Sequence, residues 1–211
     1  MTAPHRPQAH RPQAHRPQAH RPQTHRPAPH RPAPFATRRL DAVPLDPAHA
    51  DEMAGVLAGP ALYAYTGGAP EDAVSLRARY ERQCAGPSDP AERWWNWVLR
   101  IREDGRLAGY VQATVRGPRA EVAWVLGTEW QGRGYAKEAA AGLAGHLADR
   151  YGIRTVVAHI HPDHAASAAV AAAAGLAPTE VLQDGEVRYV LHPSGTRRED
   201  EVRGCGNGNG L

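Results

Sequence analysis

Two glycines separated by one arginine mark the stretch of this sequence with the clearest chemical meaning. In "TEWQGRGYAKEA", residues 128–139, Gly132 and Gly134 stand where a helical pattern begins, with Arg133 between them. Glycine is costly inside a helix, so its use there indicates backbone that must stay bare. After a strand, such a turn points free N–H groups and the helix dipole at an anion. The spacing predicts a phosphate-binding turn, to which Arg133 adds a charged contact; an ordinary tight turn remains the alternative.

The turn does not match the common nucleotide-binding motifs. It lacks the third glycine of G-x-G-x-x-G, and no Gly-Lys-Ser/Thr follows as it would in a P-loop. We therefore do not expect a dinucleotide or a nucleoside triphosphate as the ligand.

The composition narrows the class of protein. The chain has 211 residues, enough for one domain with a sizeable core, and no apolar run of about 18 residues that would predict a membrane span. It also lacks the apolar stretch of a secretory signal. Its two cysteines, Cys84 and Cys205, do not suggest a disulfide framework. A reducing cytoplasm is the expected location.

The first 34 residues differ from the rest of the chain. They repeat a five-residue unit, HRPQA or a close variant, with six arginines and no acid, so the remainder carries 19 basic and 22 acidic side chains. Proline in every unit blocks helix and sheet, and nothing apolar is available to bury. We expect a disordered arm over 1–34, a domain over 35–193 and a flexible tail over 194–211. The alternative is an arm that binds RNA, other anionic partners or metal ions weakly; nucleic-acid binding by the domain itself is not expected.

The patterns within the domain predict a mixed sheet with helices on its faces, an α/β (α+β) fold of about seven strands. Thr37 to Val43 is expected to form the first strand, and Asp46 to cap a helix that stops at Gly59. A helix is then predicted over 71–83, followed by three alternating strands within 94–127. The next helix begins at Tyr135 and ends at Gly152, and its apolar face is formed by Ala136, Ala140, Leu143, Leu147 and Tyr151. The last predicted elements are a buried strand over 155–161, a helix capped by Asp163 and closed by Gly175, and a hairpin that turns at Asp184-Gly185.

The glycine turn resembles the signature of a known family. Residues 131–136, "QGRGYA", fit the Gln/Arg-x-x-Gly-x-Gly/Ala motif of the GNAT superfamily of acetyl-coenzyme-A-dependent N-acyltransferases. The likeness covers about residues 36 to 192. Within it, "TRRLDAVPL", "EVAWVLGTEWQGRGYAKEA" and "HPDHAASAAVAAAAGLAP" resemble segments of the RimJ/RimL-type branch, which acetylates ribosomal-protein N-termini.

The resemblance implies a mostly antiparallel sheet and a site for acetyl-coenzyme A. In the family two adjacent strands splay apart and expose main-chain groups to the pantetheine arm, which places Val125, Leu126 and Gly127 along that arm. The pyrophosphate is then expected on the amides of Gly132 to Ala136, so the implied cofactor-binding residues of the turn are Gln131, Gly132, Arg133, Gly134, Tyr135 and Ala136. His164 occupies a position where the family usually has asparagine, so its contact with the cofactor is altered or weakened.

Acetyl transfer to an amine needs a base, because an alkyl ammonium is mostly charged at neutral pH. Glu121 matches a glutamate common at that place in the branch and is the first candidate, against the alternative of a solvated strand-end carboxylate. Glu129, just before the turn, is expected at the surface. Ser167 matches a family serine that can face the leaving thiolate or contact coenzyme A; a helix-surface serine is the alternative. The oxyanion is expected to be stabilised by main-chain N–H groups of the splayed strand.

Histidines and tryptophans offer other interpretations. His159 and His161 share one strand face near Asp163 and His164, but the spacing is loose and no metal is expected. The five tryptophans are expected mainly in the core, with one or two lining the acceptor cleft: Trp94, Trp95, Trp97, Trp124 and Trp130.

Together these features predict an N-acetyltransferase that moves an acetyl group from acetyl-coenzyme A to a primary amine in a direct ternary complex. The acceptor is a protein N-terminal α-amine or a small-molecule amine, selected by loops 59–70 and 84–94, which contain no recognisable motif. No membrane partner is expected, and the chain is a monomer or a homodimer. The alternative is a non-catalytic module that binds coenzyme A or a partner protein on a degenerate GNAT fold.

Overall fold

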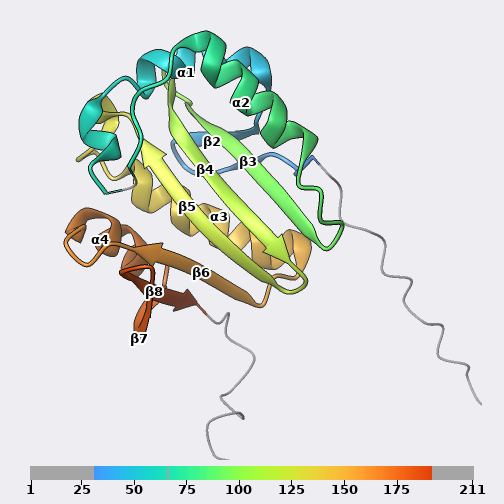
Figure 1. Cartoon of the computed structure of the whole chain (residues 1–211), viewed down its shortest axis with the longest axis vertical. Coiled ribbons are helices and arrows are strands. Elements are labelled where there is room, and N and C mark those ends of the chain that lie inside the picture. The colour runs from blue at the N-terminus through green and yellow to red at the C-terminus, as the bar shows by residue number, and fades with distance from the viewer. Residues whose placement is uncertain (1–30, 66, 192–211) are drawn as a thin grey trace, which may run out of the picture.

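One mixed sheet with helices on both faces makes up the chain in a computed structural model, which describes residues 31–65 and 67–191 (Figure 1). Its strands are β1 (Phe35–Ala36), β2 (Leu40–Pro44), β3 (Glu92–Ile101), β4 (Leu107–Arg116), β5 (Arg119–Leu126), β6 (Thr155–Ile160), β7 (Ala177–Gln183) and β8 (Glu186–Leu191). Its α-helices are α1 (Ala50–Val56), α2 (Ala73–Ala85), α3 (Tyr135–Tyr151) and α4 (Ala165–Ala173), and short 3-10 turns cover Pro47–His49, Pro60–Tyr63 and Thr128–Trp130.

The sheet has eight strands in the order β1-β2-β3-β4-β5-β6-β8-β7. Every adjacent pair is antiparallel except β5 and β6, which α3 connects in parallel. The predicted mixed, mostly antiparallel fold is therefore confirmed. The strand beyond the expected seven is β1, a two-residue strand that pairs with β2 at the sheet edge.

Two cores lie on opposite faces of the sheet. On one face, α3 packs Leu143 and Leu147 against buried side chains that include Trp97 and Val122. On the other face, α1 and α2 bury Met53 and Leu76 together with Val98 and Leu107. Figure 1 shows α3 behind the sheet and α2 along its upper right side, next to β3. The α1–α2 layer leaves part of β5 and β6 uncovered on its side, and the candidate site lies there.

Several element boundaries differ from the sequence-based expectation. The first long strand begins at Leu40 rather than Thr37, because Thr37 forms a turn in which its N–H donates to the Leu40 carbonyl at 2.8 Å. Asp46 caps the Pro47–His49 turn as predicted, but α1 ends at Val56, before Gly59. The second helix begins at Ala73 because the Asp72 side chain accepts from the Ser75 N–H and so caps it.

Local turn chemistry was predicted correctly elsewhere. Gly152 ends α3 in the left-handed conformation, with φ 67°. Gly175, with φ 85°, follows the last turn of α4 and donates to the Ala172 carbonyl. The β7–β8 hairpin turns at Asp184 and Gly185, both at positive φ.

The domain extends a few residues into the segment predicted as an arm. The Ala33 N–H donates to the Tyr151 hydroxyl at 2.7 Å, and its carbonyl accepts from the Trp97 indole at 2.9 Å. Arg31 lies 3.6 Å from Asp46. Residues 1–30 of the predicted arm and the predicted tail over 194–211 lie outside the described residues.

Candidate active site

The glycine turn presents a row of main-chain N–H groups at the start of α3. Gly132 and Gly134 have φ of 74° and 80°, a region that favours glycine, and Gly134 is the N-cap of the helix without a capping side chain. Within the described part of the chain, the N–H groups of residues 132–136 donate no hydrogen bond to another protein group. The first four N–H groups of any helix lack intrahelical partners, so this end of α3 is suited to an anion.

A half-buried ion pair between Arg39 and Glu138 holds the turn against the sheet. The Glu138 carboxylate accepts from the Thr37 hydroxyl at 2.6 Å, from the Arg39 N–H at 2.6 Å and from Arg39 Nε at 2.7 Å. Arg39 also donates to the Arg133 carbonyl at 3.0 Å, and its guanidinium lies over the Tyr135 ring. Burial alone would raise the pKa of Glu138, but the hydrogen bonds from Thr37 and Arg39 outweigh it and leave that pKa below its ordinary value.

The residues just before the turn have structural partners of their own. The Gln131 side chain donates to the Leu126 carbonyl at 3.0 Å, which folds the turn back onto the end of β5. Gly127 needs to be glycine because a Cβ there would lie 2.6 Å from the Val56 carbonyl oxygen. Arg133 places its guanidinium over the Trp130 ring, 5.4 Å from the centroid.

β5 and β6 separate part of the way along their length. Their parallel ladder ends at the pair Glu121 and Val157, although β5 continues to Leu126 and β6 to Ile160. The Gly127 N–H donates to the Ala108 carbonyl, so by alternation along β5 the main chain of Val125 faces β4 and that of Trp124 and Leu126 faces the gap. The gap therefore exposes main-chain groups between the end of the ladder and the glycine turn.

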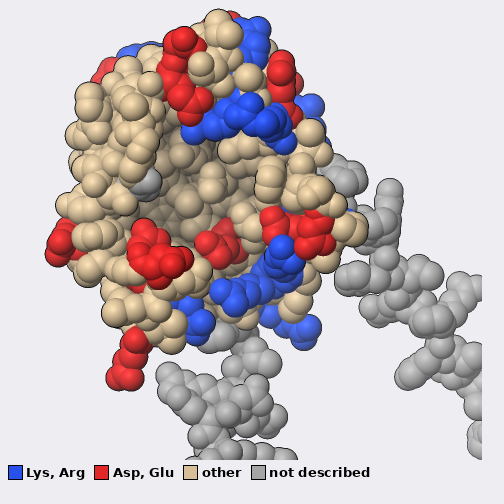
Figure 2. Space-filling model, in the orientation of Figure 1, with Lys and Arg blue, Asp and Glu red and all other residues tan. Residues whose placement is uncertain are grey.

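Glu121 lies at the narrow end of this gap, on the face that α1 and α2 cover only in part. Its side chain is 51% exposed, and its Oε1 lies 3.2 Å from Nδ1 of His159 on β6, whose side chain is only 8% exposed. Figure 2 shows a hollow on this face, with acidic side chains along its lower side and basic ones along its upper rim.

His164 has a structural role that the sequence did not reveal. The predicted N-cap of α4, Asp163, is wrong: His164 is the N-cap, and its Nδ1 accepts from the Ser167 N–H at 3.4 Å. Its ring stacks on Tyr65 at a centroid distance of 4.3 Å, and the Tyr65 hydroxyl donates to the Asp163 carbonyl. Burial, and secondarily the charge of His161, lowers the pKa of His164, which suits an acceptor nitrogen. Ser167 is half-buried in the first turn of α4.

A cavity of about 250 Å³ opens beside the end of β5. Its walls are Leu57, Leu62, Tyr63, Gly67, Arg79, Tyr110 and Val125. Burial raises the pKa of Tyr110, so its hydroxyl remains a hydrogen-bond donor at neutral pH. The cavity brings residues of the predicted acceptor loop, 59–70, against the Val125 side chain.

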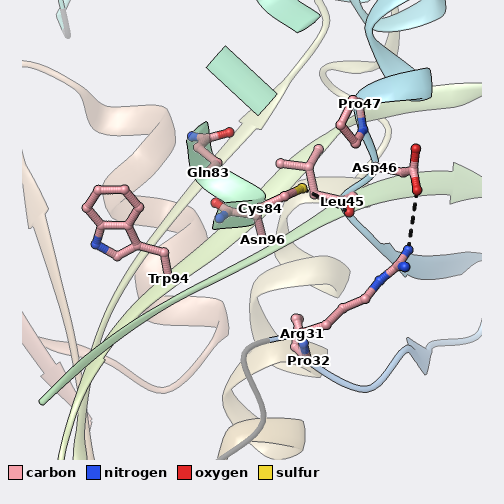
Figure 3. A pocket seen from close by; sticks show the side chains of 9 residues that line it. All are labelled: Arg31, Pro32, Leu45, Asp46, Pro47, Gln83, Cys84, Trp94 and Asn96. Carbon is pink, nitrogen blue, oxygen red and sulfur yellow. Dashed lines mark hydrogen bonds and ion pairs between the residues drawn. The ribbon is translucent and has the colours of Figure 1, made fainter. Parts of the chain in front are cut away.

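A second, smaller cavity of about 140 Å³ lies at the C-terminal end of α2 (Figure 3). Trp94 and Asn96 of β3 line it together with Cys84, whose thiol contacts the Leu45 carbonyl at 3.4 Å. Trp94 is the one tryptophan in the described residues that is exposed, at 37%. Trp95, Trp97 and Trp130 are buried, as expected for core residues.

The last of the sequence-predicted candidates, Glu129, lies at the surface of the domain. Glu129 forms an exposed pair with Arg106 at 2.9 Å, consistent with the predicted surface role. Over residues 31–65 and 67–191, no group of three or more His, Cys, Asp or Glu side chains is arranged to hold a metal ion. None of the helices in those ranges is long and apolar enough to cross a membrane.

Comparison with known proteins assigns the fold. Residues 39–177 match the profile of the acetyltransferase (GNAT) domain, which is more than half of the chain. The chain belongs to this GNAT acetyltransferase family. It is therefore an acyltransferase. A search of curated proteins finds no match.

Solved GNAT structures share the architecture. An acetyltransferase from Agrobacterium tumefaciens str. C58 is 25% identical, with a TM-score of 0.62 over 76% of this chain and 94% of that one. RimL, the ribosomal L7/L12 alpha-N-protein acetyltransferase solved with coenzyme A, is 18% identical with a TM-score of 0.62 over 76% and 98%. A spermidine N-acetyltransferase SpeG chimera from Vibrio cholerae and a second protein is 15% identical with a TM-score of 0.59 over 73% and 95%. At this level of identity, the similarity to RimL and to the SpeG chimera shows only that the fold is shared.

Two long-range contacts of this GNAT domain were missed by sequence reasoning. Arg39 and Glu138 are separated by 99 positions and Tyr65 and Asp163 by 98, so no local pattern links them. His159 was noticed only as a possible metal ligand. Val157 pairs with Glu121, and His159 lies two residues further along β6, so both side chains lie on one face; the alternation was visible in the sequence, but the register that brings the two strands together was not.

Proposed function

We propose that the chain transfers the acetyl group of acetyl-coenzyme A to a primary amine by direct attack in a ternary complex. The observation that carries the proposal is the opening between β5 and β6, with unbonded N–H groups at its wide end and the Glu121 carboxylate at its narrow end. The acceptor is a protein N-terminal α-amine or a small-molecule amine, and the structural neighbours include enzymes named for each.

In this account the turn at the start of α3 holds the diphosphate. The N–H groups of residues 132–136 donate to its oxygens, and Arg133 adds positive charge nearby. The pantetheine arm runs along the gap, where Trp124 and Leu126 offer main-chain groups. Because Leu126 already gives its carbonyl to Gln131, the Trp124 peptide is the less committed partner.

Glu121 acts as the base that takes the proton from the acceptor ammonium. A carboxylate beside the hollow also attracts the cationic amine before transfer. The neutral amine attacks the thioester carbonyl, and a main-chain N–H of the gap stabilises the oxyanion. Ser167, in the first turn of α4, donates its hydroxyl proton to the departing thiolate and takes one from the nitrogen of the tetrahedral intermediate, so coenzyme A leaves as a thiol and the product is a neutral amide. His164 contributes to the cofactor pocket by holding the first turn of α4 in place.

A thiol-release assay with a panel of amines and N-terminal peptides tests the proposal. We expect Glu121→Gln to lower kcat by about 100-fold, the usual contribution of a general base, with little change in the affinity for acetyl-coenzyme A. Glu129→Gln is the matched control, because Glu129 is an exposed carboxylate whose partner is Arg106. Equal rates for wild type and Glu121→Gln would remove Glu121 from the mechanism, and a wild type inactive toward every amine would reject the proposed function.

A further inference from the structure

The carboxylate at the narrow end of the gap has one side-chain partner among the described residues, and that partner is buried. His159 lies two residues beyond Val157, which pairs with Glu121, so both side chains project from the same face of the sheet. The two side chains differ in burial, with His159 8% exposed and Glu121 51% exposed. A fixed residue therefore contacts one that would otherwise rotate in solvent.

The chemistry of the pair sets the direction of its hydrogen bond. An ionised carboxylate can only accept, so Nδ1 of His159 must carry the proton that it donates to Glu121 Oε1 over 3.2 Å. The other ring nitrogen, Nε2, is buried and has no hydrogen-bond partner within the described chain. In a neutral ring the contact with Glu121 therefore selects the tautomer with the proton on Nδ1.

We propose that His159 is a positioning residue for the base, an inference that rests on the proposed acetyltransferase function. Its Nδ1–H holds Oε1 of Glu121 and leaves Oε2 free to accept the proton of the ammonium. After that step the acceptor is a neutral amine and Glu121 a carboxylic acid protonated on Oε2, while Oε1 still accepts from His159. Glu121 then releases this proton to solvent before the next turnover.

The reason for such a residue is entropic and geometric. A free glutamate side chain samples several rotamers and loses that freedom when it is fixed, and a misplacement of about 1 Å can lower a rate about 100-fold. The imidazole is buried, so its ring has less room to rotate than the half-exposed Glu121 side chain. It can therefore fix Glu121 before the acceptor binds.

Three substitutions separate the hydrogen bond from the bulk of the ring. His159→Asn keeps an N–H donor at the same number of bonds from Cα as Nδ1, His159→Gln moves the donor one bond further, and His159→Leu removes it. We expect kcat of His159→Asn within about threefold of wild type and kcat of His159→Leu lower by at least about tenfold. His159→Gln should lie between them, and the KM for acetyl-coenzyme A should change little in all three.

Non-additivity gives a second kinetic test. If His159 acts through Glu121, the double variant Glu121→Gln/His159→Leu should be no slower than Glu121→Gln alone. Full kcat in His159→Leu, equal losses in His159→Asn and His159→Leu, or losses that multiply in the double variant would each overturn the proposal. Melting temperatures identify any variant that fails to fold, in which case the Asn and Gln variants decide.

A measurement on the ligand-free protein tests the pair without any activity. Two-bond ¹H–¹⁵N correlation spectra of the full chain distinguish the two neutral tautomers, and His159→Asn assigns the signal by its loss. We expect the Nδ1–H tautomer in wild type and its loss of preference in Glu121→Ala. An Nε2–H tautomer in wild type would refute the His159–Glu121 pair, whereas the expected tautomer in a protein with no acetyltransferase activity would refute only the proposed function.

Discussion

The two ends of the gap between β5 and β6 are built in different ways. At the wide end, the glycine turn is held by the half-buried Glu138 carboxylate, which accepts three short hydrogen bonds from Thr37 and Arg39, and by Gln131 at the end of β5. At the narrow end, Glu121 is half exposed and its side-chain partner is His159. The rigid binding turn at the wide end suits a cofactor that is the same in every turnover. The more open narrow end suits an acceptor that must enter and leave.

The largest effect is expected from a change at the rigid end. Gly134→Asp puts a side chain at a φ of 80° and a carboxylate where the diphosphate is proposed to lie. We expect a loss of acetyl-coenzyme A affinity of at least about 100-fold, because the new charge repels the phosphates and the N-cap is strained. Isothermal titration calorimetry measures it.

Gly145→Asp is the matched control for that substitution. Gly145 lies on the exposed side of the same helix, and a Cβ there meets no neighbouring atom within 4 Å. Its affinity for acetyl-coenzyme A should stay close to that of wild type. Similar losses in both variants would mean that the effect comes from α3 in general and not from the turn.

A smaller effect is expected from a change in the Arg39–Glu138 ion pair that holds the turn. Glu138→Gln keeps one acceptor but loses the charge that faces Arg39, and we expect it to lower the free energy of unfolding by about 2 kcal/mol at pH 7. The pKa of Glu138 is lowered in the folded state, so its contribution is present above the ordinary value of 4.5 and is lost as pH falls through the lower folded value.

Denaturant unfolding of both proteins across pH 3 to 7 measures this contribution. The difference in stability between wild type and Glu138→Gln should be largest near neutral pH and shrink at the acid end. A difference that is constant across the range would show that the charge of Glu138 does not stabilise the fold.

The last prediction concerns the N-terminal boundary of the domain. Deletion of residues 2–30 should leave the melting temperature unchanged, because the proline-containing repeats offer nothing apolar to bury against the domain. Deletion of residues 2–34 removes both hydrogen bonds of Ala33 and should cost about 2 kcal/mol. Thermal unfolding of the two truncated chains separates them, and equal stability would show that Ala33 contributes nothing.

The difference between the two ends also explains what the sequence could predict. Local features could be predicted because each depends on residues only a few positions apart. They are the turn at Gly132 and Gly134, the hairpin at Asp184-Gly185 and the cap at Asp46. The ion pair between Arg39 and Glu138 joins residues 99 positions apart, and the hydrogen bond between Glu121 and His159 joins residues 38 positions apart. Such contacts arise only once strand order and register are fixed.

One local prediction failed for a related reason. Asp163 is a better N-cap by type than histidine, yet His164 caps α4. The ring of His164 stacks on Tyr65, and the Asp163 carbonyl accepts from the Tyr65 hydroxyl, so a distant loop contacts both residues of this turn. The N-cap of α4 is thus the residue whose ring packs on this distant loop, and the local sequence around Asp163 and His164 carries no sign of that contact.

A crystal of the chain soaked with acetyl-coenzyme A tests the central claim most directly. The account predicts the diphosphate at the start of α3, with its oxygens about 3 Å from main-chain nitrogens of residues 132–136 and the thioester directed along the gap toward Glu121. A diphosphate bound elsewhere, with those nitrogens left without contact to it, would contradict the account.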